Sequence, residues 1–173
     1  MNFRDLTKDD IECRVQSVKE KGLVLLLYKN ARVDMNILDD TVGAENWQRE
    51  HYECKGNLFC RVGININYVD ESMPQEYIWK ADCGTESNTE AQKGEASDSF
   101  KRACFNWGIG RELYTAPFTW INADKCNITA DKKCYDKFSV EKIIIENKRI
   151  TALAIWNDTK NVRAFVWQDK KEG

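Results

Sequence analysis

The stretch KGEASDSFKRACFNWGIGREL, residues 93–113, decides the fold of this chain. It belongs to a longer run of helix-compatible residues, in which Gly94 is tolerated at a cost of about 1 kcal/mol relative to alanine. Apolar residues recur in this run at helical spacing, which is typical of a helix with one face packed on a core. We therefore predict a long helix over 88–107. Its apolar face consists of Ala96, Phe100, Ala103 and Trp107.

The other side of this helix carries basic and polar side chains. Lys93, Ser97 and Lys101 are each four residues apart and line one strip, and Arg102 lies on the neighbouring strip. Bases late in a helix suit the helix macrodipole in any protein. Lysine and arginine also bind backbone phosphates of nucleic acids without reading the base sequence. Both interpretations stay open, with Arg111 as a further base beyond the helix.

Strands are predicted before this helix. Alternating apolar residues predict two strands over 11–28, separated near Gly22. A hairpin is expected over 46–69, with its turn at residues 55–57, and a third strand over 75–84. In the second strand of the hairpin, one face is expected to carry Leu58, Cys60, Val62, Ile64 and Ile66.

A shorter helix and a C-terminal group of strands complete the prediction. The helix covers 30–43, where Asn30 can cap its start and Gly43 can end it. The segment 137–167 is expected to form three antiparallel strands, with turns near Asn147 and at NDTKN. The predicted fold class is α+β: an antiparallel β-β-β-α core with the long helix packed on the sheet, and extra C-terminal strands.

Composition excludes several classes of protein. The chain has 173 residues, 42% of them hydrophobic, and a net charge of −2, so a histone-like polyanion binder is not expected. No run approaches the roughly 20 apolar residues of a membrane helix. The start, MNFRDLTKDD, lacks the layout of a signal peptide. A cytoplasmic protein that does not associate with membranes is therefore expected.

The cysteines do not predict a metal site. There are seven, an odd number, and no two form a C-x-x-C pair. Cys126 and Cys134 lie in a segment that reads as a charged loop, residues 121–137, too far apart for a standard zinc knuckle. Buried free thiols in a reducing compartment are the preferred interpretation.

The nucleotide-binding and nuclease motifs in this sequence are incomplete. In GIGREL, residues 108–113, Leu113 stands where a dinucleotide fingerprint has glycine or alanine, and no phosphate-binding G-x-x-x-x-G-K-[ST] loop occurs. No cofactor is therefore predicted. Glu146 and Lys148 give half of a restriction-like nuclease signature, but a metal-dependent nuclease needs a second carboxylate close enough to share the ion. A polar hairpin turn is the preferred interpretation of this segment.

The segment DCGTESNTEAQKGEASDSFKRACFNWGIGRELY, residues 82–114, resembles the core signature of the Rad52 superfamily of single-strand annealing proteins. It is most similar to short members carried by bacteriophages and prophages of Gram-positive bacteria. In that family, a sheet ending in D.G.G/E leads into a helix with A.TDALKRA and then FG..LG..LY. The counterparts here are Asp82, Gly84, Glu86, Ser97, Asp98, Lys101, Arg102, Ala103, Trp107, Gly108, Gly110, Leu113 and Tyr114.

A second segment upstream carries the same resemblance. YKNARVDMNILDDTVGAENWQ, residues 28–48, is similar to the family's helix followed by G...W, with Gly43 and Trp47 in the expected places. Together the two segments extend the resemblance over roughly residues 23–120.

The resemblance implies function as well as fold. Family members form rings or helical assemblies that hold single-stranded DNA in a basic groove, and they need no ATP and no catalytic residue. Lys101 and Arg102 match the groove-lining basic pair, and Phe105 replaces a further base of the family. The DNA-binding residues expected here are Lys101, Arg102, Lys93, Arg111, Arg32, Ser97 and Tyr114.

The sequence thus predicts an annealing protein that acts in recombination and repair. The annealing core is expected over 1–136, with a β extension over 137–173 packed on the same domain. Expected partners are single-stranded DNA, further copies of the chain, and a phage exonuclease or a host single-strand-binding protein. The alternatives are a metal-dependent nuclease and an interaction module that has the same fold but does not bind DNA.

Overall fold

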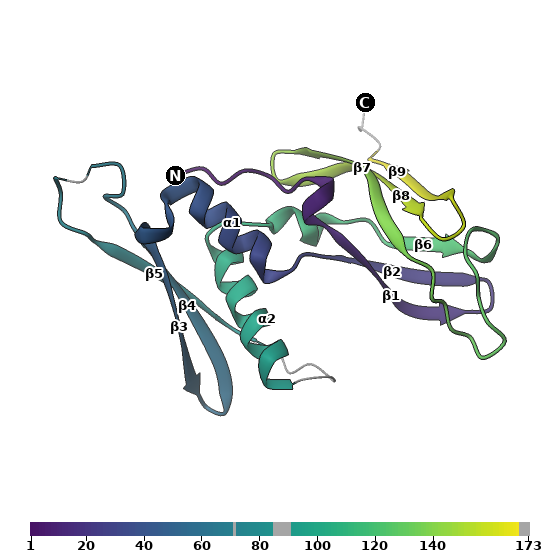
Figure 1. Ribbon diagram of the computed structural model, residues 1–173, viewed down its shortest axis with the longest axis horizontal. Helices are drawn as coiled ribbons and strands as arrows, with labels where there is room; N and C mark the ends of the chain where they lie inside the picture. The colour runs from purple at the N-terminus through teal and green to yellow at the C-terminus, as the bar shows by residue number, and fades with distance from the viewer. Residues whose placement is uncertain (71, 85–90, 170–173) are drawn as a thin grey trace. The chain divides into compact units, whose positions relative to one another are not determined.

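The structure is a computed structural model that describes residues 1–70, 72–84 and 91–169, with the side chains of residues 91–93 left out (Figure 1). The chain divides into two compact units. The first consists of Met1–Arg4 and Asn30–Gly110, and the second of Asp5–Lys29 and Arg111–Gly173. Among the described residues there are two α-helices and nine strands, all of which pair antiparallel. The predicted α+β fold class is confirmed.

The first unit contains a three-stranded meander. Strands β3 (Trp47–Cys54), β4 (Asn57–Asn65) and β5 (Tyr77–Cys83) pair in the order β3-β4-β5. The turn between β3 and β4 is formed by Lys55 and Gly56, with φ angles of 52° and 75°. Two successive positive φ angles are the geometry of the tight hairpin turns that match the strand twist. The hairpin expected from the sequence is confirmed.

Helix α2 (Ala91–Asn106) packs on one face of this sheet through the predicted apolar stripe. Phe100 and Ala103 are fully buried, and Trp107 donates its indole N–H to the carbonyl of Val62 on β4 at 3.0 Å. The helix therefore has its apolar side against β3-β4-β5, as the sequence predicted. The cap expected at residue 88 lies outside the described residues.

Helix α1 (Ala31–Val42) begins and ends where the sequence predicted. The side-chain oxygen of Asn30 accepts a hydrogen bond from the backbone N–H of Arg32 at 2.9 Å, which satisfies one of the orphan donors of the first turn. Gly43 ends the helix with a φ of 86°, a conformation that glycine adopts without steric cost. Leu38 is fully buried, and α1 contacts both α2 and β3.

The second unit contains a six-stranded sheet in the order β6-β2-β1-β7-β8-β9. Within it, β1 and β7 are joined by one residue pair, Glu12 with Ser139, whereas β9 also lies in contact with β6. The C-terminal strands therefore extend the sheet that β1 begins. The strands are β1 (Glu12–Lys19), β2 (Gly22–Tyr28), β6 (Thr119–Asn122), β7 (Phe138–Glu146), β8 (Arg149–Asn157) and β9 (Val162–Gln168).

Two local predictions were wrong. The segment 121–137 was expected to be a loop throughout, but its start belongs to β6, because Ile121 pairs with Leu23 and is fully buried. Ile66 was expected on the buried face of β4, but the strand ends at Asn65 and Ile66 is 38% exposed. The alternation of apolar residues did not show where β6 lies or where β4 ends.

A polar network anchors the loop between β6 and β7. Asp136 accepts hydrogen bonds from the backbone and side chain of Asn127 at 2.8 and 2.9 Å, and from Asn157 at 2.8 Å. Asn157 is fully buried and also donates to the carbonyl of Lys125 at 2.9 Å. Burial alone would raise the pKa of Asp136, but these hydrogen bonds outweigh it and lower the pKa below its usual value.

Gly84, directly after β5, sets how closely the strand approaches α2. A Cβ at this position would lie 2.3 Å from the carbonyl oxygen of Glu95 and 3.0 Å from the backbone nitrogen of Ser99. Neither backbone atom can move without displacing the helix. We expect Gly84→Ala to lower the free energy of unfolding by about 1–3 kcal/mol, the usual cost of overpacking.

Urea denaturation followed by circular dichroism measures this effect. Ala81→Ser, at an exposed position on β5, serves as the control and should change stability by no more than about 0.5 kcal/mol. Equal stability of Gly84→Ala and wild type would show that the strand and helix do not approach as closely as described.

The network around Asp136 predicts a pH dependence of stability. Because the folded-state pKa lies below the unfolded value, the carboxylate stabilises the fold above the unfolded pKa, and this contribution disappears as the pH falls through the folded pKa. Asp136→Asn should therefore be less stable at neutral pH and should lose less stability than wild type between about pH 6 and pH 3. Urea denaturation at a series of pH values tests this, and parallel pH profiles would contradict it.

Candidate nucleic-acid interface

The strip of α2 that faces away from the sheet carries Ser97 and Lys101. Both side chains are half-buried, and they are one helical turn apart. Lys101 follows Phe100, so its side chain leaves the helix about 100° away from the buried ring. Within the described part of the chain, no ion pair engages the Lys101 ammonium. This lysine is therefore available for an external anion.

Arg102 points toward β5. Its Nε lies 3.4 Å from Oδ1 of Asp82, and the two side chains are 40% and 27% exposed. An ion pair this open to water contributes at most about 1 kcal/mol. Asp82 also accepts from the backbone N–H of Cys83 at 2.8 Å and from the amide of Asn106 at 3.4 Å. The carboxylate is thus fixed in place and orients the guanidinium along the edge of β5.

Lys80 is a basic residue of this region that the sequence reasoning missed. Its Nζ lies 3.0 Å from the carbonyl of Asn106, the last residue of α2, and 4.5 Å from the centre of the Trp107 ring. The charge therefore lies at the negative end of the helix dipole. Strand alternation could have found it, because Lys80 and Asp82 are two residues apart on β5 and so share a face of the sheet.

The other predicted residues lie on different elements. Arg32 is exposed in the first turn of α1, in the first unit. Lys93 is in the first turn of α2, and its side chain lies outside the described residues. Arg111 and Tyr114 are exposed on the 3₁₀ helix Arg111–Thr115, which belongs to the second unit. The structure thus brings Ser97, Lys101 and Arg102 together on α2.

A comparison with protein families identifies the chain. The model described as Rad52/22 family double-strand break repair protein matches residues 3–131. The chain belongs to this family. Comparisons with curated proteins and with solved structures gave no match. The family match contains both helices and strands β1 to β6, and it ends before β7, β8 and β9.

Membership in the Rad52/22 family makes this a double-strand break repair protein. The Asp82–Arg102 pair and the Gly84 approach lie at the junction between the sheet and the long helix, inside the family match. Phe105, which the resemblance aligns with a further base of the family, is half-buried on α2. No helix within the described part of the chain is long and apolar enough to span a membrane.

Aromatic residues that follow the basic strip in the sequence have different environments. Trp107 is part of the core, through its hydrogen bond to Val62 and its contact with Lys80. Trp120 is half-buried and donates to Asn122 at 3.0 Å, whereas Tyr114 and Phe118 are 70% and 72% exposed. Exposed rings can stack on unpaired bases, at about 1–3 kcal/mol per base.

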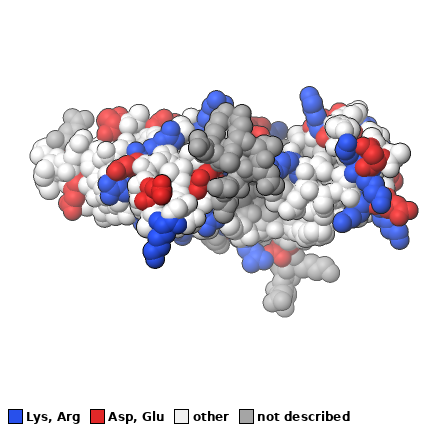
Figure 2. Space-filling model, turned by 90° about the horizontal axis from the view of Figure 1, so that it is seen from below, with Lys and Arg blue, Asp and Glu red and all other residues white. Residues whose placement is uncertain are grey.

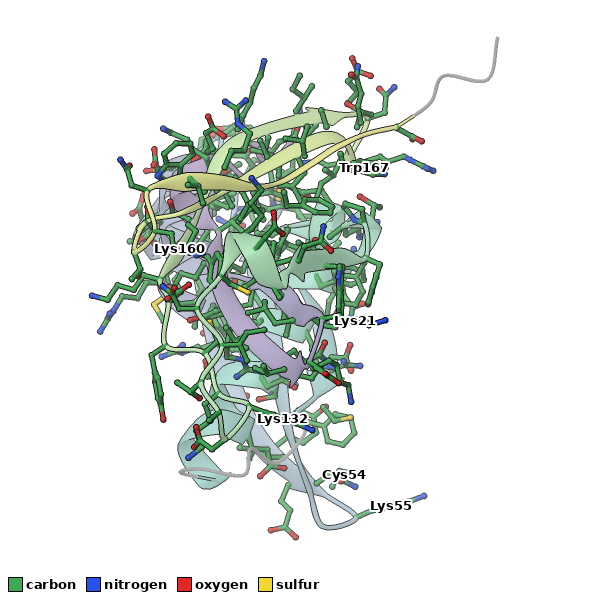
Figure 3. All side chains as sticks on the ribbon, turned by 90° about the vertical axis from the view of Figure 1, so that its right-hand side faces the viewer. Lys21, Cys54, Lys55, Lys132, Lys160 and Trp167 are labelled. Carbon is green, nitrogen blue, oxygen red and sulfur yellow. The ribbon has the colours of Figure 1, made fainter. Side chains whose placement is uncertain are left out.

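On the face that Figure 2 displays, basic and acidic side chains alternate in small groups. Several lysines lie at turns and loops and not on α2, among them Lys21, Lys55, Lys132 and Lys160, which Figure 3 labels. Binding of a polyanion must therefore depend on a local group of bases, since the net charge is −2.

The half-signature of a nuclease falls on a hairpin turn. Asn147 and Lys148 form the β7–β8 turn with φ angles of 53° and 60°, and the Lys148 ammonium lies 2.7 Å from Asp5. Among the described residues, no group of three or more His, Cys, Asp or Glu side chains could hold a metal ion.

The position of Trp107 predicts a structural role. Trp107→Phe removes the indole N–H and leaves the Val62 carbonyl without that donor, so we expect the free energy of unfolding to fall by about 1–3 kcal/mol. The affinity of the folded variant for oligonucleotides should equal that of wild type. Chemical denaturation and fluorescence anisotropy measure the two quantities. A loss of affinity without a loss of stability would instead indicate that Trp107 contacts the ligand.

Proposed function

We propose that this Rad52/22 family protein binds single-stranded DNA and anneals complementary strands without ATP, as a ring or filament of identical subunits. The observation that supports this most directly is the outward strip of α2. There a half-buried lysine without a described ion pair lies beside an arginine held by Asp82. The match to a double-strand break repair family supports a polyanionic ligand for such a strip.

The proposed mechanism is physical and forms no covalent intermediate. Lys101 and Arg102 bind the sugar-phosphate backbone, which leaves the bases free to sample a complementary strand. Arg32, Lys93 and Arg111 support this contact, Ser97 donates a hydrogen bond, and Tyr114 stacks on a base. Single subunits bind weakly, and an assembly that places many strips on one strand multiplies these contacts. Base pairing then selects the partner strand.

Charge reversal on α2 tests this proposal. We expect Lys101→Glu with Arg102→Glu to lower the affinity for a single-stranded oligonucleotide roughly 100-fold or more, because two charge-assisted contacts are worth about 1.5–3 kcal/mol each. Fluorescence anisotropy at low salt measures the affinity, and a complementary labelled strand measures annealing. For wild type, the logarithm of the binding constant should fall steeply with the logarithm of the salt concentration, by about 0.7 per phosphate contact.

The matched control is Lys55→Glu with Lys132→Glu, which makes the same change in net charge at two exposed turn residues that are not part of α2. It should bind nearly as well as wild type. If the two double variants bind equally well, the assignment to α2 is wrong. If wild type itself ignores single strands in dilute buffer, the chain is an interaction module on this fold. Shortened oligonucleotides in the presence of magnesium would instead indicate a nuclease.

A further inference from the structure

The connection between β4 and β5 displays an unusual amount of apolar surface. It leaves the end of the three-stranded sheet and loops out from it (Figure 1). Exposed apolar side chains scattered singly are normal, but a group on one short connection marks an interaction site. The group consists of Ile66 (38% exposed), Val69 (79%), Met73 (51%) and, at the start of β5, Ile78 (46%).

Hydrogen bonds join the two ends of this connection, at residues 65–67 and 74–76. The backbone N–H of Ile66 donates to Glu76 at 2.8 Å, and Oδ1 of Asn65 accepts from the backbone N–H groups of Asn67 and Glu76 at 3.1 and 3.0 Å. The side chain of Asn67 donates to the carbonyl of Pro74 at 2.9 Å. A loop ordered before binding loses little conformational entropy when a partner covers it.

The same connection is acidic. Asp70 accepts from the backbone and hydroxyl of Ser72 at 3.0 and 2.6 Å, and these bonds lower the pKa of its carboxyl. Glu76 is exposed at the other end of the loop. The partner of this loop should therefore offer an apolar surface bordered by positive charge.

A groove in the second unit offers an apolar surface with lysines beside it. It lies between β7 and the N-terminal segment that includes the 3₁₀ helix η1 (Lys8–Asp10), has a volume of about 430 Å³, and is lined in its apolar part by Leu6, Ile143 and Ile145. This volume is within the range of pockets that bind small molecules, so it accommodates more than one side chain.

Ion pairs neutralise the two acids that line the groove. Asp5 pairs with Lys148 at 2.7 Å, and Glu141 forms a two-bond pair with Arg163. Lys8 and Lys142 are exposed and form no ion pair within the described part of the chain. The two acids of the groove are thus neutralised, while its two remaining lysines are not.

We propose that the β4–β5 connection of one copy of this chain binds in the groove between η1 and β7 of the next copy. Val69 and Met73 cover the apolar part of the groove, and Asp70 and Glu76 face Lys8 and Lys142. The contact joins two different surfaces, so it is head-to-tail and builds a ring or a filament. This inference rests on the proposed function, to which it adds the residues that join the subunits.

Complementation between two variants tests the interface. The loop variant is Val69→Lys with Met73→Lys, and the groove variant is Lys8→Glu with Lys142→Glu. All four positions are exposed, so both variants should fold. By sedimentation velocity with single-stranded oligonucleotide present, wild type should assemble and each variant alone should be monomeric. An equimolar mixture should form a heterodimer and nothing larger, because one intact loop meets one intact groove.

A third chain that carries all four substitutions should be monomeric like each variant alone, because it has neither an intact loop nor an intact groove. The control Lys55→Glu with Lys132→Glu should assemble like wild type. Assembly of either variant alone to wild-type size, or a mixture without heterodimer, would overturn this interface. Wild type that stays monomeric with DNA would overturn it as well.

These experiments distinguish a failure of this interface from a failure of the proposed function. Variants that assemble normally and still require Lys101 and Arg102 for DNA binding would leave the proposed function standing and remove only this interface. Monomeric variants should still bind single strands weakly at low salt, because α2 is unchanged in them. Loss of all binding by wild type would instead contradict the proposed function.

Discussion

The packing of α2 on β3-β4-β5 is the contact on which the first unit depends. Phe100 and Ala103 are fully buried, Trp107 is hydrogen-bonded to β4, and the absence of a side chain at Gly84 lets the backbone of β5 approach the helix. Once this face is buried, helix geometry determines where every other side chain of α2 points. Lys101 faces outward and Arg102 faces the edge of β5 because of the residues that lie underneath.

This arrangement bears on the proposed binding of a polyanion by a chain with a net charge of −2. The bases of α2 form a small local group, and Asp82 offsets part of it, so one subunit carries only a few usable positive charges. Repetition around an assembly is a physical route from such weak sites to a stable complex. In the proposed function, affinity depends as much on the contacts between subunits as on the bases themselves.

The sequence was informative wherever the signal was local. The stripe of α2, the caps of α1 and the β3–β4 turn each depend on residues a few positions apart, and all three were predicted. Pairings between distant segments were not. β6 was missed because its strand character comes from β2, and Lys80 was missed because its partners, Asn106 and Trp107, lie on another element. Whether the bases of α2 bind DNA, and where a domain boundary lies, stay predictions.

The two units differ in how far apart their contacting segments lie in the sequence, and this affects how they fold. The sheet and both helices of the first unit lie within Asn30–Gly110, so its contacts close short loops. In the second unit β1 pairs with β7 and β2 pairs with β6, and these partners lie far apart in the sequence. Their pairing requires the closure of long loops, which is slow. During synthesis the β1–β2 hairpin leaves the ribosome with Leu23 and Leu25 uncovered, long before its partner strands exist. Such an interval exposes apolar surface to other chains, so the early hairpin is where misassembly would begin.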